Sequence, residues 1–236
     1  MRPVEKWNVG DPDGASGQIS HSYIPHGSAA SVLIRNLGYF CSYCEVFDSS
    51  PQIEHVVPVI QDRSKQHEWA NFLLACSRCN GADNKGSKPV VVEELYLPHL
   101  NNTLLPFVYL EGGKVQVREG LGPEQRRRAE KTMKLIGLDK YPGNADYPSH
   151  NPRDKRWEHR RKAWEVATRK LSAYLSGNLS AQAIAEFAHQ KGFFSVWYTV
   201  FKAHQAVVRE LIDVFEGTKA HFFDENDGYS PIPRGD

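Results

Sequence analysis

Apolar residues follow two different patterns along the chain, and the change falls near residue 120. Before this point, short apolar runs are separated by Gly, Pro, Asn and Asp; after it, apolar residues recur every three or four positions. The first pattern is typical of short strands and turns, and the second of amphipathic helices. The sequence therefore predicts an α+β protein with a mainly α-helical C-terminal half.

The first part of the chain is expected to contain one helix and two β-hairpins. Residues 29–37 have helical spacing, and Gly38 suits a helix end. Residues 1–25 are rich in Gly, Pro, Asp and Ser and predict a weakly structured lead-in. The two hairpins are predicted from strand-like runs at 46–47 and 52–57, and at 107–110 and 114–117.

Beyond residue 120 the pattern predicts helices joined by short turns. The first runs from Pro123 to Ile136 and ends at Gly137. Ser180 is expected to cap a later helix that buries Ile184 and Phe187. The tail after residue 217 is expected to be loosely ordered. Two apolar stripes are expected to form core, one of Trp157, Trp164, Leu171 and Leu175, and one of Phe194, Trp197, Phe201, Val208, Leu211, Ile212 and Phe215.

Composition is that of an ordinary globular protein. The chain has 236 residues, of which 40% are hydrophobic and 24% charged. No stretch approaches the roughly 20 apolar residues of a membrane span, and no secretory leader is evident, so a cytoplasmic protein without a membrane partner is expected. Four units are predicted: a lead-in and helix at 1–40, a core at 41–95, a hairpin extension at 96–120 and a helical region at 121–236.

Charge is unevenly distributed, although the net charge is only +1. Residues 126–170 are basic and the last stretch is acidic. A basic band suits a nucleic-acid backbone. A solvated helix face with ion pairs such as Glu158 with Lys162 explains it equally well, and the sequence leaves both interpretations open.

The four cysteines fall in two pairs of identical spacing, Cys41-Ser-Tyr-Cys44 and Cys76-Ser-Arg-Cys79. Two intervening residues let one turn present both thiolates to a tetrahedral ion, so the pairs predict a closed structural Zn²⁺ site. Two disulfides are the alternative, but a core of this size in a reducing compartment has little need of them.

Between and just after these pairs the chain offers the groups that phosphodiester hydrolysis requires. Glu54, His55, Asn71 and Asn80 supply a carboxylate, an imidazole and two amides, with Lys85 close behind. An imidazole suits a general base at pH 7, and oxygen ligands suit Mg²⁺ or Mn²⁺ rather than zinc. Adjacent residues on a flat strand face opposite ways, so Glu54 and His55 can share a site only at a bulge or strand end.

The succession Cys-x-x-Cys, Glu-His-x-x-Pro, Trp-Ala-Asn-Phe-Leu-Leu-Ala-Cys-x-x-Cys-Asn and Lys-Gly resembles the HNH nucleases, which have a ββα-metal core. The resemblance implies that His55 is the general base, that Glu54 and Asn80 bind the catalytic cation, and that Asn71 braces the loop and the base. It implies a nucleic-acid substrate, with DNA favoured over RNA.

This chain departs from the HNH pattern at two points. Glu54 stands where Asp is commoner, which keeps the carboxylate and lengthens its reach by one methylene. Four residues instead of two separate Asn80 from Lys85, so Asn84 is an alternative metal ligand. Lys85 and Arg78 are candidate phosphate contacts, and each is equally explained as a solvated loop residue.

A further resemblance extends over most of the chain. The opening Met-Arg-Pro-Val-Glu-Lys, the run at 38–45, the second hairpin and residues 130–138 are similar to the HNH subunit family of Septu and retron-linked antiphage systems, PtuB. Those proteins act with an ABC-type ATPase, PtuA, which implies such a partner for the helical half and leaves a homo-oligomer within the complex open. The alternatives are a stand-alone restriction-type HNH nuclease and a non-catalytic zinc module that binds nucleic acid or a protein.

Overall fold

The computed structural model of the chain describes residues 1–144 and 153–235. Its helices and strands confirm the α+β class, with small two-stranded sheets and a helical C-terminal half. The elements are α1 (Ala30–Leu37), β1 (Gln52–His55), β2 (Phe72–Ala75), β3 (Phe107–Leu110), β4 (Lys114–Val117), α2 (Pro123–Ile136), α3 (Arg156–Leu175), α4 (Ala181–Lys191), α5 (Phe194–Phe201), α6 (Gln205–Val214), β5 (Phe223–Asp224) and β6 (Ser230–Pro231).

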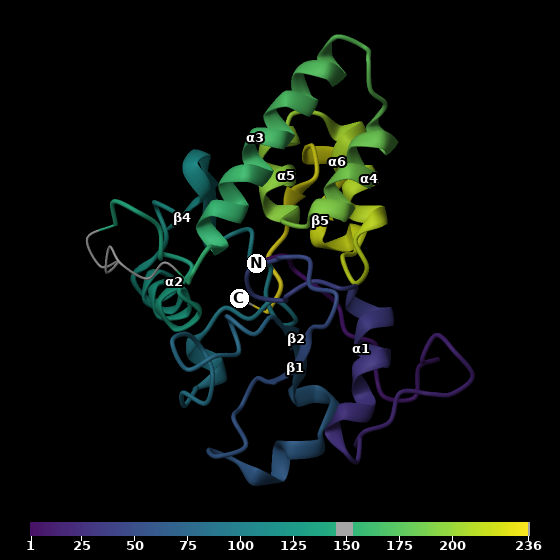
Figure 1. Cartoon of the computed structure of the whole chain (residues 1–236), viewed down its shortest axis with the longest axis vertical. Helices are drawn as coiled ribbons and strands as arrows, with labels where there is room; N and C mark the ends of the chain where they lie inside the picture. The colour runs from purple at the N-terminus through teal and green to yellow at the C-terminus, as the bar shows by residue number, and fades with distance from the viewer. Residues whose placement is uncertain (145–152, 236) are drawn as a thin grey trace.

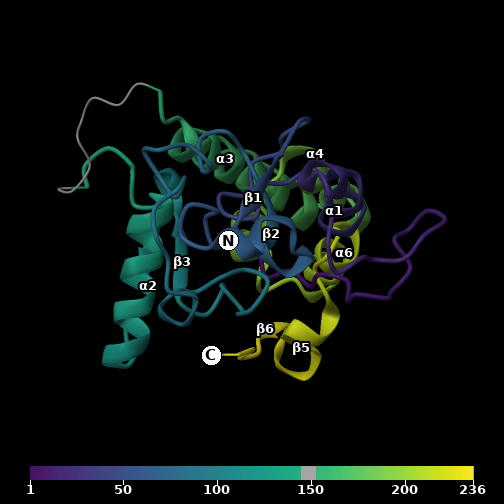
Figure 2. The ribbon, with the colours of Figure 1, turned by 90° about the horizontal axis from the view of Figure 1, so that it is seen from below.

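Helices α3 to α6 lie together at one end of the molecule, and α1 with β1 and β2 lies at the other (Figure 1). Helix α2 stands at the side of these two parts, as the second view also shows (Figure 2). The buried apolar residues form two clusters, one around α1, β1, β2 and α2 and one around α4, α5 and α6. None of the described helices is both long and apolar enough to cross a membrane.

Strand β1 lies where it was expected, but its partner was predicted wrongly. It pairs antiparallel with β2, with Glu54 opposite Leu73 and His55 opposite Phe72. Val46 and Phe47 instead make isolated bridges, to Gly192 and Phe40. The sequence signal failed because β2 is buried throughout, and a short continuous apolar run does not distinguish a strand from other buried segments.

Helix ends and the second hairpin follow the predicted positions. Helix α1 ends before Gly38, and α2 ends at Gly137, whose left-handed backbone (φ 69°) suits glycine. Ser180 caps α4 by accepting a hydrogen bond of 3.1 Å from the Ala183 amide. Strands β3 and β4 pair across the predicted turn.

The stripe on α5 and α6 forms core as expected, but two of the other predicted core positions are wrong. Phe187 on α4 is 40% exposed and Leu175 at the end of α3 is 66% exposed. On α3 the fully buried positions are instead Ala163 and Ala167, together with two arginines. Small side chains at these positions let α3 approach α5 closely, which the hydrophobic spacing alone does not reveal.

Both ends of the described chain are more ordered than predicted. The Arg2 guanidinium is buried and donates hydrogen bonds to Thr218 Oγ1 (2.7 Å) and the Leu37 carbonyl (2.8 Å). In the tail, Phe222 is buried, and Arg234 donates to the Val4 carbonyl at 2.8 Å. The two ends therefore pack against each other, a long-range contact that local composition does not indicate.

Glu45 joins the two parts of the molecule. Its carboxylate is buried, accepts hydrogen bonds from the Ser195 amide (2.7 Å) and the Tyr109 hydroxyl (3.0 Å), and pairs with the Met1 amino group at 2.8 Å. The backbone approaches closely as well, because a Cβ on Gly192 would lie 2.6 Å from the Glu45 carbonyl oxygen. The first cysteine pair is thus fixed to the start of α5.

Most of the basic band is explained by ion pairs. Arg127 and Lys131 on α2 both pair with Glu94, and Lys162 on α3 pairs with Glu158 at 3.0 Å. Arg156 and Arg160 are buried. These contacts favour the solvated-face interpretation over a continuous phosphate-binding surface.

Candidate functional site

The two cysteine pairs meet in one buried cluster, called here the cysteine cluster (Cys41, Cys44, Cys76 and Cys79). The first pair lies in the turn after α1 and the second directly follows β2. Each pair closes a tight turn, in which the Glu45 amide donates to the Cys41 carbonyl (2.9 Å) and the Asn80 amide to the Cys76 carbonyl (3.0 Å). Pairing of β1 with β2 spans the interval between the two turns. All four sulfur atoms lie within 4.8 Å of one another.

The donor set fits a structural zinc ion. The cysteines form no disulfide, and the Cys44 and Cys76 sulfurs are 3.7 Å apart. Tetrahedral ligation with Zn–S of about 2.3 Å places sulfurs about 3.8 Å apart. Spacing, burial and number of thiols all agree, so the cluster is consistent with the predicted zinc site and not with the disulfide alternative.

A buried arginine from α3 contacts this cluster. The Arg156 guanidinium donates to Cys79 Sγ at 3.2 Å and pairs with Asp154 at 2.7 Å. It also donates to Asn84 Oδ1 at 3.1 Å. A donor to a ligating sulfur neutralises part of the thiolate charge. This contact could not be predicted from sequence patterns, since Arg156 stands 77 residues after Cys79.

Three of the predicted site residues line one pocket, called here the strand-end pocket. Glu54, His55 and Asn80 are among the residues that line a pocket of about 170 Å³ at the end of β1. Its remaining wall is formed by Ile53, Pro58, Val59, Ile60, Gly86 and Ser87. Residues that carry a carboxylate, an imidazole and an amide therefore lie around one pocket, and Asn80 directly follows the last residue of the cysteine cluster.

Glu54 is almost completely buried, with an exposed fraction of 1%. Its Oε1 pairs with Lys85 Nζ at 2.5 Å and accepts a hydrogen bond from the Tyr43 hydroxyl at 3.3 Å. Burial raises the pKa of Glu54, and Lys85 and Tyr43 oppose this shift by stabilising the carboxylate. Both contacts use Oε1, so the second carboxylate oxygen is the one that suits a ligand.

His55 is held by a backbone carbonyl. Its Nε2 lies 2.9 Å from the Gln66 carbonyl oxygen, which can only accept, so Nε2 carries the proton and Nδ1 keeps a lone pair. The ring packs edge-on against His26 and Phe72, with centroids 5.0 and 5.3 Å away. Burial lowers the pKa of His55, which favours the neutral form needed by a base.

No bulge brings Glu54 and His55 to the same face. Their pairing with β2 is regular, and Glu54 points into the core whereas His55 is half-buried. His55 is the last residue of β1. Of the two arrangements that would let Glu54 and His55 share a site, a bulge or a strand end, the structure therefore has the strand end.

The three candidate site asparagines, Asn71, Asn80 and Asn84, have different surroundings. Asn71 is buried, accepts from the Val57 amide (2.7 Å) and donates to the Val57 and Lys65 carbonyls (2.9 and 3.1 Å), so it braces the loop after β1. Asn80 lines the pocket and donates to Gln52 Oε1 at 3.2 Å, which leaves its own oxygen for a ligand. Asn84 is fully buried, and its oxygen accepts from Lys140 (2.8 Å) and from Arg156. The geometry favours Asn80 over Asn84 as a metal ligand.

The two candidate phosphate contacts, Lys85 and Arg78, differ in burial. Lys85 is buried with an exposed fraction of 1%, and its ammonium contacts Glu54 and the His55 carbonyl. Arg78 is partly exposed, pairs with Asp83 at 3.6 Å and is not among the pocket residues. Lys85 thus contacts both Glu54 and His55, the last two residues of β1.

The sequence interpretation missed two groups that act on the pocket. Tyr43 was counted only as a spacer within its cysteine pair, yet it hydrogen-bonds Glu54. Gln66 orients His55 through its backbone carbonyl, which no side-chain pattern can reveal. Tyr43 could have been found, because a residue between two ligands of a buried ion is itself fixed close to the site.

The oxygen donors of the pocket fit Mg²⁺ or Mn²⁺. Glu54 offers one carboxylate oxygen and Asn80 one amide oxygen, the hard ligands these cations prefer. The Lys85 ammonium already neutralises part of the Glu54 charge. Because the protein supplies so few ligands, a cation there would depend on water and on substrate phosphate to complete its coordination.

The comparisons with known proteins agree with this geometry. Residues 41–86 match the HNH endonuclease family, and this segment contains the cysteine cluster, β1, β2 and Lys85. The chain therefore carries an HNH endonuclease domain, which implies a nuclease that acts on nucleic acid with a divalent metal ion. A search of curated proteins found no significant match.

Proposed function

We propose that the protein is a metal-dependent endonuclease that hydrolyses phosphodiester bonds in nucleic acid, with DNA favoured over RNA, in the cytoplasm. The observation that carries this proposal is that Glu54, His55 and Asn80 line one pocket inside the segment that matches the HNH family. Asn71 supports the pocket by holding the loop after β1.

In this proposal each residue has a distinct task. His55 Nδ1 accepts the proton of the attacking water, while the Gln66 carbonyl fixes the ring and stabilises the imidazolium that forms. Glu54 and Asn80 hold the divalent cation, which when bound stabilises charge on the scissile phosphate and the leaving 3′ oxygen. Lys85 opposes the rise in the pKa of Glu54 that burial causes, and so favours the carboxylate form.

His55→Ala tests the proposal. Mg²⁺-dependent cleavage should fall by about 100- to 10,000-fold, the usual contribution of a general base. Zinc content and melting temperature should barely change, because the ring is half-buried and makes a single hydrogen bond within residues 1–144 and 153–235. His221→Ala is the matched control, since that ring is exposed and pairs with Glu5. A His55→Ala protein that cuts as fast as the parent would remove the proposed base.

We also propose that this nuclease is the effector subunit of an antiphage complex with an ABC-type ATPase. The support is the similarity of the opening residues, the run at 38–45 and residues 130–138 to the Septu HNH subunit. The helices α3 to α6 have their own apolar cluster and are the part available for docking such a partner. Co-expression with an adjacent ATPase gene should yield a stable complex on size-exclusion chromatography, and two separate peaks would count against the proposal.

A further inference from the structure

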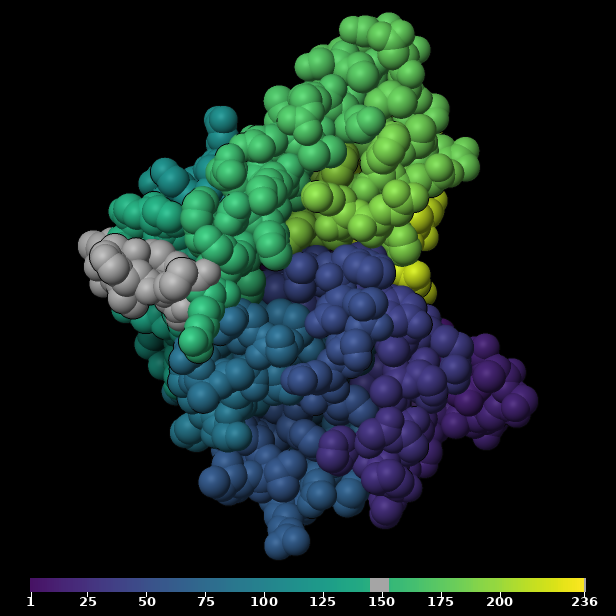
Figure 3. Space-filling view, viewed as in Figure 1, coloured from purple at the N-terminus to yellow at the C-terminus, as the bar shows by residue number. Residues whose placement is uncertain are grey.

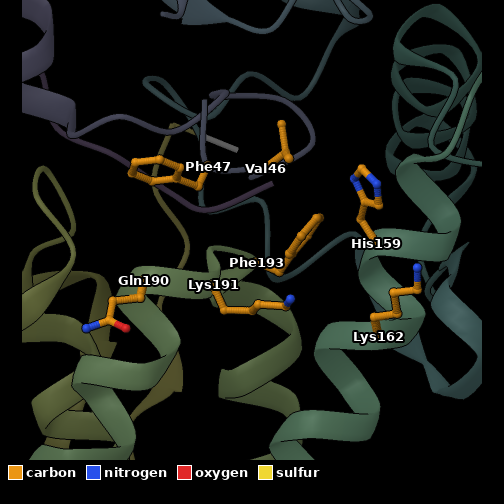
Figure 4. Close-up of a pocket in the computed structure, with 7 residues that line it drawn as sticks. All are labelled: Val46, Phe47, His159, Lys162, Gln190, Lys191 and Phe193. Atoms are coloured by element: carbon orange, nitrogen blue, oxygen red, sulfur yellow. The ribbon is translucent and has the colours of Figure 1, made fainter. Parts of the chain in front are cut away.

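A second pocket lies where the HNH domain meets the helical half. It has a volume of about 240 Å³ and is called here the junction pocket. Four segments contribute to it: the residues after the first cysteine pair, α3, the end of α4 and the start of α5. In the space-filling view, the residues of α3 and α4 meet those of the HNH domain along this boundary (Figure 3). Its lining residues are Val46, Phe47, His159, Lys162, Gln190, Lys191 and Phe193 (Figure 4).

The backbone around the junction pocket is closely fitted. Val46 forms a bridge with Gly192, and the Phe193 amide donates to the Glu45 carbonyl at 2.9 Å. Any side chain at Gly192 would collide with that carbonyl, and the glycine also has a left-handed backbone (φ 73°). The pocket walls are therefore held in one relative position by the same contacts that join the two parts of the molecule.

The charge of the pocket is positive. Its lining contains two lysines and a histidine and no acidic residue. Lys162 shares Glu158 with Lys155, whereas Lys191 has no ion pair with any residue in 1–144 or 153–235. The amine of Lys191 is directed toward α3, which carries Lys162 and His159 (Figure 4). Both lysines therefore border the pocket between these two helices.

An aromatic surface adjoins this positive charge. Phe47 lines the pocket, is 45% exposed, and contacts Tyr39, which is 44% exposed, with ring centroids 6.1 Å apart. Exposed rings beside lysines are the combination that holds unpaired nucleotides, because every base has a face that stacks and every nucleotide carries a phosphate.

We propose that the junction pocket binds one unpaired nucleotide of the substrate strand, with its base on Phe47 and its phosphate between Lys162 and Lys191. Tyr39 extends the same surface for a neighbouring base. This assignment rests on the proposed nuclease function for the identity of the strand. It makes the protein prefer nucleic acid with a single-stranded segment, since a paired base cannot stack on Phe47.

Binding of a fluorescein-labelled 12-nucleotide single strand and of the matching duplex tests the proposal. Anisotropy is measured without Mg²⁺ or Mn²⁺, so that nothing is cleaved. Phe47→Ala should weaken single-strand binding about tenfold, the size expected for one lost base stack, and leave duplex binding unchanged. Lys191→Gln should lower the salt dependence of single-strand binding by about 0.7 in log–log slope, the value for one phosphate contact.

Matched changes elsewhere serve as controls. Lys202→Gln removes one charge at the far end of α5, and Leu175→Ala removes an exposed apolar side chain at the end of α3. Phe47→Leu keeps apolar packing against Phe40 without the ring, should the alanine variant fold poorly. If the Phe47 and Lys191 variants bind the single strand as the parent does, the proposal is overturned.

Two further results show whether the ligand is a free nucleotide or part of a strand, and whether the inference depends on the proposed catalytic base. A deoxynucleoside monophosphate that binds as tightly as the 12-nucleotide strand would assign the pocket to a free nucleotide and overturn its role for the substrate. Because the assay measures binding alone, its result can be interpreted whether or not His55→Ala abolishes cleavage. If His55→Ala cleaves as fast as the parent, the proposed base is wrong, and Phe47-dependent binding of the single strand would still support this inference.

Discussion

The cysteine cluster and the strand-end pocket lie side by side in the same HNH domain, yet their side chains are used in opposite ways. The four thiols are buried and lie close together. The pocket has an open side, and Glu54 and His55 reach it from the end of β1 with different degrees of burial. A site that stabilises the fold can be closed, whereas a site for chemistry must admit a substrate.

Buried polar residues connect the two sites. Arg156 contacts Cys79 and Asn84, and Lys85 lies directly after Asn84 in the chain and pairs with Glu54. The position of Glu54 therefore depends on a segment fixed to the cysteine cluster. Changes at the cluster should cost stability first and activity as a consequence, and changes at the less buried pocket residues His55 and Asn80 should cost activity alone.

The largest effect is expected from Cys76→Ser. The substitution leaves three thiol ligands, and structural zinc contributes roughly 10 kcal/mol or more to folding in small zinc domains. The protein should lose zinc and the HNH domain should unfold, as measured by zinc content and circular dichroism. A soluble, zinc-free protein that still cuts nucleic acid would show that the cluster is not needed for the fold.

A smaller loss of stability is expected from Arg156→Met. The change removes the donor to Cys79 and leaves the buried Asp154 carboxylate unpaired, which costs about 3–5 kcal/mol. Competition with a chelator should also show zinc affinity reduced about 10- to 100-fold. Arg161→Met is the control, since its pair with Glu165 is exposed and should contribute less than about 1 kcal/mol. If the two variants are equally stable, the contact between Arg156 on α3 and the cysteine cluster does not stabilise the fold.

The smallest effect on stability, and the sharpest contrast, is expected from two asparagines. Asn84→Ala removes one acceptor of Arg156 and Lys140 and the donor to the Arg78 carbonyl, and should cost about 2–3 kcal/mol in chemical denaturation. Asn80→Ala loses one exposed hydrogen bond and should unfold at nearly the same denaturant concentration, but its cleavage should require more Mg²⁺. The reverse outcome, with Mg²⁺ dependence changed only in Asn84→Ala, would make Asn84 the ligand.

Local signals in the sequence predicted much of the structure. The equal spacing of the cysteine pairs predicted their convergence, and the glycines after α1 and α2 predicted where those helices end. Three of the residues named from the Glu54-His55 motif and the Asn80 position line the strand-end pocket, whereas its other lining residues were not predicted. These features depend on residues close in sequence or on one shared ion, so short-range chemistry determines them.

Long-range contacts could not be predicted in the same way. The partner of β1, the packing of Arg2 against the end of the chain and the contact of Arg156 with Cys79 all join distant segments. The sequence did not distinguish Lys85 from an ordinary loop lysine, and its ion pair with Glu54 is seen only in the structure. Burial of a charged side chain is a property of the assembled core, and no spacing rule gives it.

The central claim is that the cysteine cluster holds the fold and the strand-end pocket performs the chemistry, each with its own metal ion. It is tested most directly by removing only the weakly held cation. Protein dialysed against EDTA and then returned to metal-free buffer should retain one zinc and its melting temperature, show no cleavage, and regain full cleavage on addition of Mg²⁺ or Mn²⁺. Cleavage that persists without an added cation, or a fold that is lost and restored together with Mg²⁺, would contradict the account.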